Sequence, residues 1–406
     1  MLLTTFFLKG IMSGTGFVFF YEIECLERYK YIYNERRITM KKLGFGLMRL
    51  PIIGGDHSKI DIDAVKKMVD EFMARGFTYF DTAYVYHGGQ SEVAFREAVV
   101  KRYPRDAFTV TTKLPLFSKP DRAGMEKIFK ESMERLGVEY IDYYWLHAMN
   151  KDLYEHAESV DAFGYLKELK AAGKIKHIGF SFHDGPEVLE KMLSEHPEVE
   201  YVQLQINYLD WEDGWVRGRR CYEVATRYGK PVIVMEPVKG GALANLPKSA
   251  ARIFDSYDPK PSYASWAIRY CASLDNVMTV LSGMSNLEQV LDNTGYMEDF
   301  KPLTEEDYKV IAKVAQNLKF AIPCTACRYC TDGCPMKISI PDIFALYNEY
   351  KRDMKKLPEF RTKYMELTSS SSGKASACIG CEQCKEHCPQ NLDIPKLLAE
   401  CVLELE

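Results

Sequence analysis

Between residues 41 and 298 the chain alternates between two hydrophobic patterns. Short, almost continuously apolar runs rich in β-branched and aromatic residues predict strands that are buried on both faces. Between them lie amphipathic stretches, and those over 61–76, 122–137 and 162–173 each end in a glycine, as helices commonly do. The expected strands are 43–47, 78–82, 108–113, 141–147, 177–182, 201–207, 231–237 and 279–283.

Eight such strands with helices between them, over about 260 residues, predict an α/β fold, the (β/α)8 barrel. An open doubly wound sheet is the alternative, but it normally carries G-x-G-x-x-G after its first strand. Here that place reads LGFGLMRLP, with two glycines and no helical pattern after it. Further helices are expected over 91–102, 186–196, 214–228, 262–274, 286–297 and 304–319.

The C-terminal part contains an internal repeat. The segment that starts CTACRYC at Cys324 recurs as CIGCEQC at Cys378, and each landmark returns 54 residues later, as Cys388 does after Cys334. A fixed period indicates two similar structural units. Residues 351–377 between them predict a helix followed by a Ser/Gly loop. We therefore expect a barrel over 40–300, a linker helix over 301–323 and a small, mostly helical domain over 324–406.

Composition narrows the class of protein. The chain has 406 residues, 47% hydrophobic and 27% charged, which is typical of a globular protein. A net charge of −4 gives no reason to expect a nucleic-acid partner. Residues 1–39 are a poor membrane span, because Lys9 and several glycines interrupt the apolar start. They are also a poor signal peptide, because neither a basic start nor a small-residue cleavage site is clear. We interpret them as an extra leader, with a membrane-associated leader as the alternative, and expect no membrane span elsewhere.

The cysteines are distributed unevenly. Of twelve, only Cys25, Cys221 and Cys271 precede residue 324. Both tail runs read C-x2-C-x2-C-x3-C-P, the spacing by which two-cluster ferredoxins bind [4Fe-4S] clusters, with the fourth cysteine of each run reaching the other cluster. Zinc is the alternative, although zinc sites use paired cysteines and leave no role for a third. A cytoplasmic, reducing location suits such thiolates. The expected ligand sets are Cys324, Cys327, Cys330 and Cys388 for one cluster, and Cys378, Cys381, Cys384 and Cys334 for the other.

Polar side chains follow three of the predicted strands. In a barrel of this kind chemistry occurs at the carboxyl ends of the strands, where Asp81, Lys113 and His147 lie, and Tyr86 follows in the next loop. Each alone has a structural explanation, such as a cap or a core aromatic. Together they predict that Tyr86 is a proton donor, because the ammonium of Lys113 lowers the pKa of a nearby phenol and the carboxylate of Asp81 keeps that ammonium charged. The imidazole then orients a carbonyl oxygen.

These residues and their surroundings resemble the aldo-keto reductases. The motifs are FDTAYVYHGGQSE (80–92), TTKL (111–114), IDYYWLH (141–147), GKIKHIGFS (173–181), VQLQINY (202–208), MEPVKGGAL (235–243) and LSGMSNLEQVLDN (281–293). The resemblance implies an Asp81, Tyr86, Lys113 and His147 tetrad and an NAD(P)H-dependent oxidoreductase acting on small carbonyl or alcohol substrates. It implies nicotinamide contacts from Ser181 and Gln203. It also implies that the dinucleotide contacts Glu236, Pro237, Lys239, Gly240, Gly241, Gly283, Gln289 and Asn293.

Some positions depart from the family pattern. Phe182 stands where the family often has Asn after the serine of the fifth strand, here Ser181. Met235 replaces a tyrosine that stacks on nicotinamide in the family. The usual cation for a 2′-phosphate is missing near Ser285 and Gln289, which leaves NADPH and NADH open. A barrel with a binding or scaffold role is the alternative to an enzyme.

The tail resembles bacterial-type ferredoxin domains of the helical kind. A nicotinamide transfers two electrons as a hydride, whereas a cubane transfers one, and no flavin motif accompanies them. Three interpretations remain open. In the first, the clusters of a carbonyl reductase pass electrons in turnover or to a redox protein partner. In the second, the clusters are a structural or sensing appendage of an ordinary reductase. In the third, the barrel is an idle scaffold for an electron-transfer or adaptor module.

Overall fold

Short strands with β-branched and aromatic side chains close into a parallel barrel in the computed structural model, which describes residues 41–212, 216–318, 322–352, 354–369 and 372–406. Each strand pairs with its neighbours in sequence, and β1 pairs with β8 to close the barrel. The (β/α)8 prediction is confirmed, and the leader predicted over 1–39 lies outside the described residues. The strands are β1 (Leu43–Gly46), β2 (Tyr79–Asp81), β3 (Thr109–Pro115), β4 (Ile141–Met149), β5 (Ile175–Phe182), β6 (Tyr201–Gln205), β7 (Val232–Met235) and β8 (Val277–Ser282).

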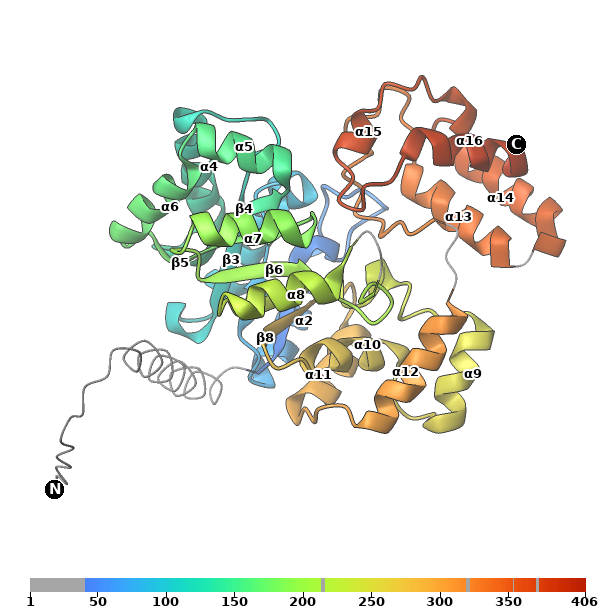
Figure 1. Ribbon diagram of the computed structural model, residues 1–406, viewed down its shortest axis with the longest axis horizontal. Helices are drawn as coiled ribbons and strands as arrows, with labels where there is room; N and C mark the ends of the chain where they lie inside the picture. Colours follow the sequence, from blue (N-terminus) through green and yellow to red (C-terminus); the bar gives the residue numbers. More distant parts are fainter. Residues whose placement is uncertain (1–40, 213–215, 319–321, 353, 370–371) are drawn as a thin grey trace, which may run out of the picture. The chain divides into compact units, whose positions relative to one another are not determined.

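Helices surround these strands (Figure 1). The helix predicted over 91–102 is α3 (Gln90–Phe95), continued by a turn of π-helix over Arg96–Val100. Two helices, α5 (Lys151–Ser159) and α9 (Lys248–Tyr257), were not expected, because each is a short, largely polar insert that buries only a few side chains. The helices of the barrel region are α2 (Ile62–Ala74), α3 (Gln90–Phe95), α4 (Arg122–Leu136), α5 (Lys151–Ser159), α6 (Ala162–Ala171), α7 (Pro186–Glu195), α8 (Gly218–Arg227), α9 (Lys248–Tyr257), α10 (Tyr263–Ala272), α11 (Leu287–Glu298) and α12 (Glu305–Asn317).

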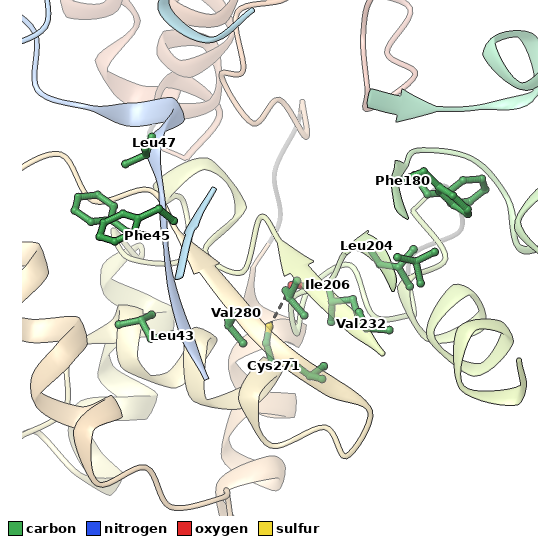
Figure 2. Close-up of a cluster of buried hydrophobic side chains, with 14 of the residues drawn as sticks. Leu43, Phe45, Leu47, Phe180, Leu204, Ile206, Val232, Cys271 and Val280 are labelled. Carbon is green, nitrogen blue, oxygen red and sulfur yellow. Dashed lines mark hydrogen bonds between the residues drawn. The ribbon is translucent and has the colours of Figure 1, made fainter. Parts of the chain in front are cut away.

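The hydrophobic core fixes where the strand ends lie. Leu43 and Phe45 of β1, Val280 of β8 and Leu204 of β6 belong to one buried cluster (Figure 2). Within it the Cys271 thiol lies 3.1 Å from the carbonyl oxygen of Ile206, as expected for a packed cysteine rather than a ligand. This core holds the carboxyl ends of β2, β3, β4 and β5 at one end of the barrel.

Gly179 shows how closely the barrel is packed. A Cβ atom at this position of β5 would lie 1.8 Å from a ring carbon of Trp145 on β4, and Trp145 is fully buried. Only a residue without a side chain leaves room for that indole.

The C-terminal region has a hydrophobic core of its own, formed by Ile343, Phe344, Tyr364 and Leu398 among others. Its helices are α13 (Ile340–Arg352), α14 (Leu357–Thr368), α15 (Gln383–Glu386) and α16 (Ile394–Leu405), coloured orange to red in Figure 1. By contrast, Val310 and Ile311 of α12 belong to the barrel's core. Among the described helices, none has the length and apolar character needed to cross a bilayer.

Candidate active site

The four side chains predicted from the strand ends meet at one end of the barrel. Lys113 Nζ donates to Asp81 Oδ1 at 2.6 Å and to the Thr82 carbonyl oxygen at 2.8 Å. It also lies 3.4 Å from the Tyr86 hydroxyl. The ring of His147 packs edge-on against that of Tyr86, with centroids 5.9 Å apart. Residues from β2, β3, β4 and the turn after β2 therefore form one cluster.

Local structure explains this convergence. Asp81 is the last residue of β2 and pairs in register with Thr111 of β3, two positions before Lys113. Side chains alternate along a strand, so those two positions share a face and Lys113 points toward Asp81. Tyr86 begins a short 3-10 turn, Tyr86–Gly89, that carries it back over the barrel.

Burial dominates the electrostatics of this cluster. Lys113 is fully buried and Asp81 is 3% exposed, so burial lowers the pKa of Lys113 and raises that of Asp81, while each opposes the other's shift. Burial also raises the pKa of Tyr86 well above its usual value, and Tyr329 and Asp81 add to that rise. The expected lowering by Lys113 is thus outweighed, and Tyr86 is a protonated phenol at neutral pH.

His147 is a neutral imidazole. Burial lowers its pKa well below the usual value, and Lys113 contributes in the same direction. Its Nε2 lies 3.4 Å from the hydroxyl of Tyr329, whereas among the described residues its Nδ1 has no hydrogen-bond partner. A neutral ring can donate one hydrogen bond to an oxygen beside Tyr86.

A cavity of about 380 Å³ opens beside the cluster and extends across the barrel end. Asp81, Tyr86 and His147 line it, while Lys113 lies behind Tyr86. Nine of the ten positions expected to contact a dinucleotide also line this cavity: Ser181, Gln203, Glu236, Pro237, Gly240, Gly241, Gly283, Gln289 and Asn293.

At the tetrad end of the cavity, Ser181 and Gln203 are register partners on β5 and β6 and both are buried. Ser181 Oγ accepts from the Ala148 amide at 2.7 Å, and the Gln203 amide donates to Asp81 Oδ2 at 3.2 Å. Two fixed polar groups beside Tyr86 can bind a carboxamide.

Lys239 is the exception among the ten. Its ammonium is buried and lies 2.5 Å from Asp210 Oδ1, and its side chain does not line the cavity. The turn that it begins, Lys239–Gly241, still contributes the Gly240 amide, which donates to Glu236 Oε2 at 2.6 Å. Arg49 lies 3.7 Å from the same carboxylate.

Polar side chains gather at the other end of the cavity. Asn293 donates to Ser282 Oγ at 2.8 Å, and Gln289 Oε1 accepts from the Ser285 amide at 2.7 Å. Asp292 also lines this end and accepts from Ser262. Apart from Arg49, no lysine or arginine of the described residues lines the cavity.

The tail cysteines surround two small pockets in the sets that their spacing predicts. One pocket is lined by Cys324, Cys327, Cys330 and Cys388, and the other by Cys334, Cys378, Cys381 and Cys384. No three His, Cys, Asp or Glu side chains of the described residues converge on a point that would hold one metal ion. A cluster of four irons presents a different iron to each thiolate, so ligands that surround a pocket fit it.

The surroundings of the first cysteine set also fit a cluster. Apolar side chains such as Ile340 and Phe344 line the first pocket and keep it dry.

The sequence analysis missed the tail residues that enter the barrel's cavity. Thr325, Cys327 and Tyr329 from the first cysteine run line it, as do Pro389 and Gln390 from the second. Arg49 was missed as well, although it follows the first strand. No local pattern marks these positions, because the cysteine runs predict only their own ligands.

Comparison with known proteins adds an independent line of evidence. The model of the aldo/keto reductase family matches residues 42–316, and that of the 4Fe-4S dicluster domain matches residues 323–392. Among curated proteins, the chain is 24% identical over 325 residues to an NADH-specific methylglyoxal reductase of Escherichia coli, covering 70% of this chain and 97% of that protein.

A probable aldo-keto reductase of Glycine max is 29% identical over 174 residues, which cover 41% of this chain and 48% of that protein. Among solved structures, an aldo-keto reductase of Bacillus halodurans in its holo form superimposes with a TM-score of 0.55 at 26% identity. That match covers 69% of this chain and 94% of the other.

Proposed function

This chain belongs to the aldo/keto reductase family, and we propose that it interconverts carbonyl and alcohol groups of small substrates with a nicotinamide dinucleotide. The observation that carries the proposal is the buried network of Asp81, Lys113 and Tyr86 beside His147, opening into a cavity lined by nine expected dinucleotide positions. A scaffold protein has no need of a buried charge pair against a phenol. A buried ion pair adds little net stability to a fold, so its presence beside a cavity favours a functional role.

The dinucleotide, when bound, supplies a hydride to the carbonyl carbon. Ser181 and Gln203 would hold the carboxamide beside Tyr86, and the backbone over 236–241 together with Arg49 would hold the pyrophosphate. The proposal extends to NADH as the preferred form, because Asp292 lines the far end and repels a 2′-phosphate while it can accept from a 2′-hydroxyl. The E. coli relative is named as NADH-specific, which agrees with this preference.

Tyr86 gives its proton to the carbonyl oxygen as the C–H bond forms, and it takes the proton back in the oxidation of an alcohol. His147 Nε2 holds that oxygen through a hydrogen bond and stays neutral because of its burial. Lys113 supplies the positive charge that stabilises the Tyr86 phenolate left after transfer, and Asp81 keeps Lys113 charged and in place.

The proposal assigns two [4Fe-4S] clusters to the two cysteine pockets, each able to take up or release one electron when bound. Cys381 of the second set is exposed, whereas Cys330 of the first is buried. A redox protein partner would therefore meet the second cluster, and a reducing compartment such as the cytoplasm suits both.

An anaerobic assay of NADH and NADPH oxidation tests the proposed activity, with methylglyoxal and 4-nitrobenzaldehyde as substrates. Tyr86→Phe removes the proton donor, so we expect kcat to fall about 10²–10⁴-fold while dinucleotide binding persists. Tyr84→Phe is the matched control, because its hydroxyl binds Glu131 and does not line the cavity.

Undiminished turnover by Tyr86→Phe would refute the proton-donor role. If the wild type oxidises neither dinucleotide with any carbonyl compound, the alternative of an electron-transfer or adaptor module is favoured. Cys327 on the cavity wall is the observation that supports that alternative.

A further inference from the structure

Residues 325–329, called here the cluster loop, belong to the first cysteine run and yet line the barrel's cavity. Thr325, Cys327 and Tyr329 contribute to the same wall as Tyr86 and His147. Cys327 within the loop and Cys330 directly after it are two of the expected ligands of the first cluster. The first cluster and the candidate active site therefore share one stretch of chain.

Several contacts hold the cluster loop against the barrel. Arg49 Nη2 donates to the Thr325 carbonyl oxygen at 2.8 Å. The approach at Gly240 is close enough that a Cβ atom there would lie 2.3 Å from the same oxygen. Beside the loop, Gln390 of the second cysteine run is also held, because its side-chain amide exchanges two hydrogen bonds with that of Gln205 on β6, at 3.0 and 2.8 Å.

The loop's own conformation directs Tyr329 toward the barrel. Ala326 and Arg328 have positive φ values of 52° and 66°, which non-glycine residues adopt rarely. Arg328 faces the tail and binds Asp342 of α13, with its two Nη atoms 2.7 and 3.1 Å from the carboxylate oxygens. The next residue, Tyr329, faces the cavity.

Tyr329 meets the tetrad at the atoms that handle the substrate oxygen. Its hydroxyl lies 3.4 Å from His147 Nε2 and interacts with the Tyr86 hydroxyl. Its ring lies 6.2 Å from that of His147 and 6.3 Å from that of Phe117, between centroids. Two polar groups, the Tyr329 hydroxyl and His147 Nε2, thus lie beside the Tyr86 hydroxyl that would release its proton.

A second side chain of the loop, that of Thr325, also belongs to the cavity wall. Thr325 is 2% exposed and lines the cavity, and among the described residues its hydroxyl has no hydrogen-bond partner. A buried hydroxyl left unpaired is unfavourable in the folded protein. Thr325 therefore adds a second residue of the loop to the wall that Tyr329 helps to form.

We propose that Tyr329 is a substrate-binding residue of the barrel, contributed by the cluster loop, and that the first cluster holds it in place. The inference rests on the proposed carbonyl chemistry. The Tyr329 hydroxyl donates a hydrogen bond to the substrate oxygen beside Tyr86 and His147, and its ring with that of Phe117 forms an aromatic wall. Loss of the first cluster releases the loop and removes both contributions.

Steady-state kinetics with Tyr329→Phe test the substrate contact, using methylglyoxal and 4-nitrobenzaldehyde in anaerobic buffer. We expect kcat/KM to fall about tenfold, mainly through KM, with NADH binding and iron content unchanged, as for the loss of one neutral hydrogen bond. Tyr347→Phe, in the tail's own core, is the matched control and should behave as the wild type. A kcat/KM for Tyr329→Phe within twofold of the wild type overturns the proposal.

Hydrogen–deuterium exchange tests the placement without any turnover. Cys327→Ser should lower the iron content and speed exchange in the 84–89 peptide, because Tyr329 no longer covers Tyr86. Cys381→Ser should lower the iron content and leave that peptide unchanged. Equal exchange in the two variants contradicts the proposal. If only the carbonyl assay fails while the exchange difference holds, the proposed function is wrong and the placement stands.

Discussion

Replacing Lys113 by methionine tests the electrostatic reasoning on which the site depends. Methionine preserves most of the buried volume and removes the ammonium, which leaves Asp81 buried with the Gln203 amide as its remaining partner. In the wild type, burial raises the pKa of Asp81 and Lys113 opposes that rise. Without Lys113 the pKa of Asp81 in the folded state is raised further.

The burial of Asp81 determines how much stability Lys113→Met should lose. Removing one member of a buried ion pair destabilises a protein by about 3–5 kcal/mol. Proton uptake by the carboxyl group limits the loss, because neutralising an aspartate of ordinary pKa near 3.9 requires about 4 kcal/mol at pH 7 and about 2 kcal/mol at pH 5.5. The folded variant binds more protons than the unfolded chain, so its stability falls as pH rises.

Thermal unfolding of the anaerobic, cluster-loaded protein, followed by circular dichroism, measures this loss. At about 2 °C for each kcal/mol, Tm should fall by about 8 °C at pH 7 and about 4 °C at pH 5.5. The double variant Asp81→Asn/Lys113→Met, which leaves no uncompensated charge, should recover most of the difference. An equal decrease at both pH values, or a double variant as unstable as Lys113→Met, would refute the reasoning.

Two further predictions concern the cavity. Gly240→Ala combines a φ of +64° with a Cβ atom 2.3 Å from the Thr325 oxygen, so it should displace the cluster loop and lower the iron content of the purified protein. The control is Gly241→Ala, which has a φ of +95° and open space around it, so it carries similar backbone strain and should keep its iron. Equal iron content in the two variants argues against a close contact between Gly240 and Thr325. Asp292→Asn removes a negative charge from the far end of the cavity, so the ratio of kcat/KM for NADPH to that for NADH should rise about tenfold, equivalent to about 1.4 kcal/mol. An unchanged ratio in steady-state assays means that Asp292 does not face the 2′ position.

The parts of the structure that follow from local pattern were predictable from the sequence. The barrel strands are nearly continuous apolar runs, and the meeting of Asp81, Tyr86, Lys113 and His147 follows from strand ends sharing one side of a parallel barrel. The two cysteine sets follow from their spacing alone.

The remaining features depend on contacts between distant residues. Tyr329 reaches the cavity because Arg49 binds Thr325 and Gln205 binds Gln390, and no periodicity or motif connects those positions. Lys239 lies in a turn that carries backbone amides to the cavity, yet its side chain turns away to Asp210. A motif identifies the residue type at a position. The direction in which that side chain points depends on the partner that the fold brings near it.

The shared cluster loop also bears on how the two kinds of chemistry coexist. A hydride carries two electrons and a cubane accepts one, so direct exchange between them needs an intermediary that no motif in the sequence provides. If Tyr329 binds the substrate as proposed, no such intermediary is required. The first cluster then affects the rate of turnover by holding a substrate-binding side chain in place. Iron–sulfur ligation depends on thiolates that are easily oxidised. Oxidative loss of the first cluster would then lower the rate of carbonyl reduction, because Tyr329 would no longer be held beside Tyr86. Activity would report the integrity of the first cluster even if no electron passed between cluster and substrate. On this proposal the first cluster acts as a sensor, while the second is the one that a redox partner would meet.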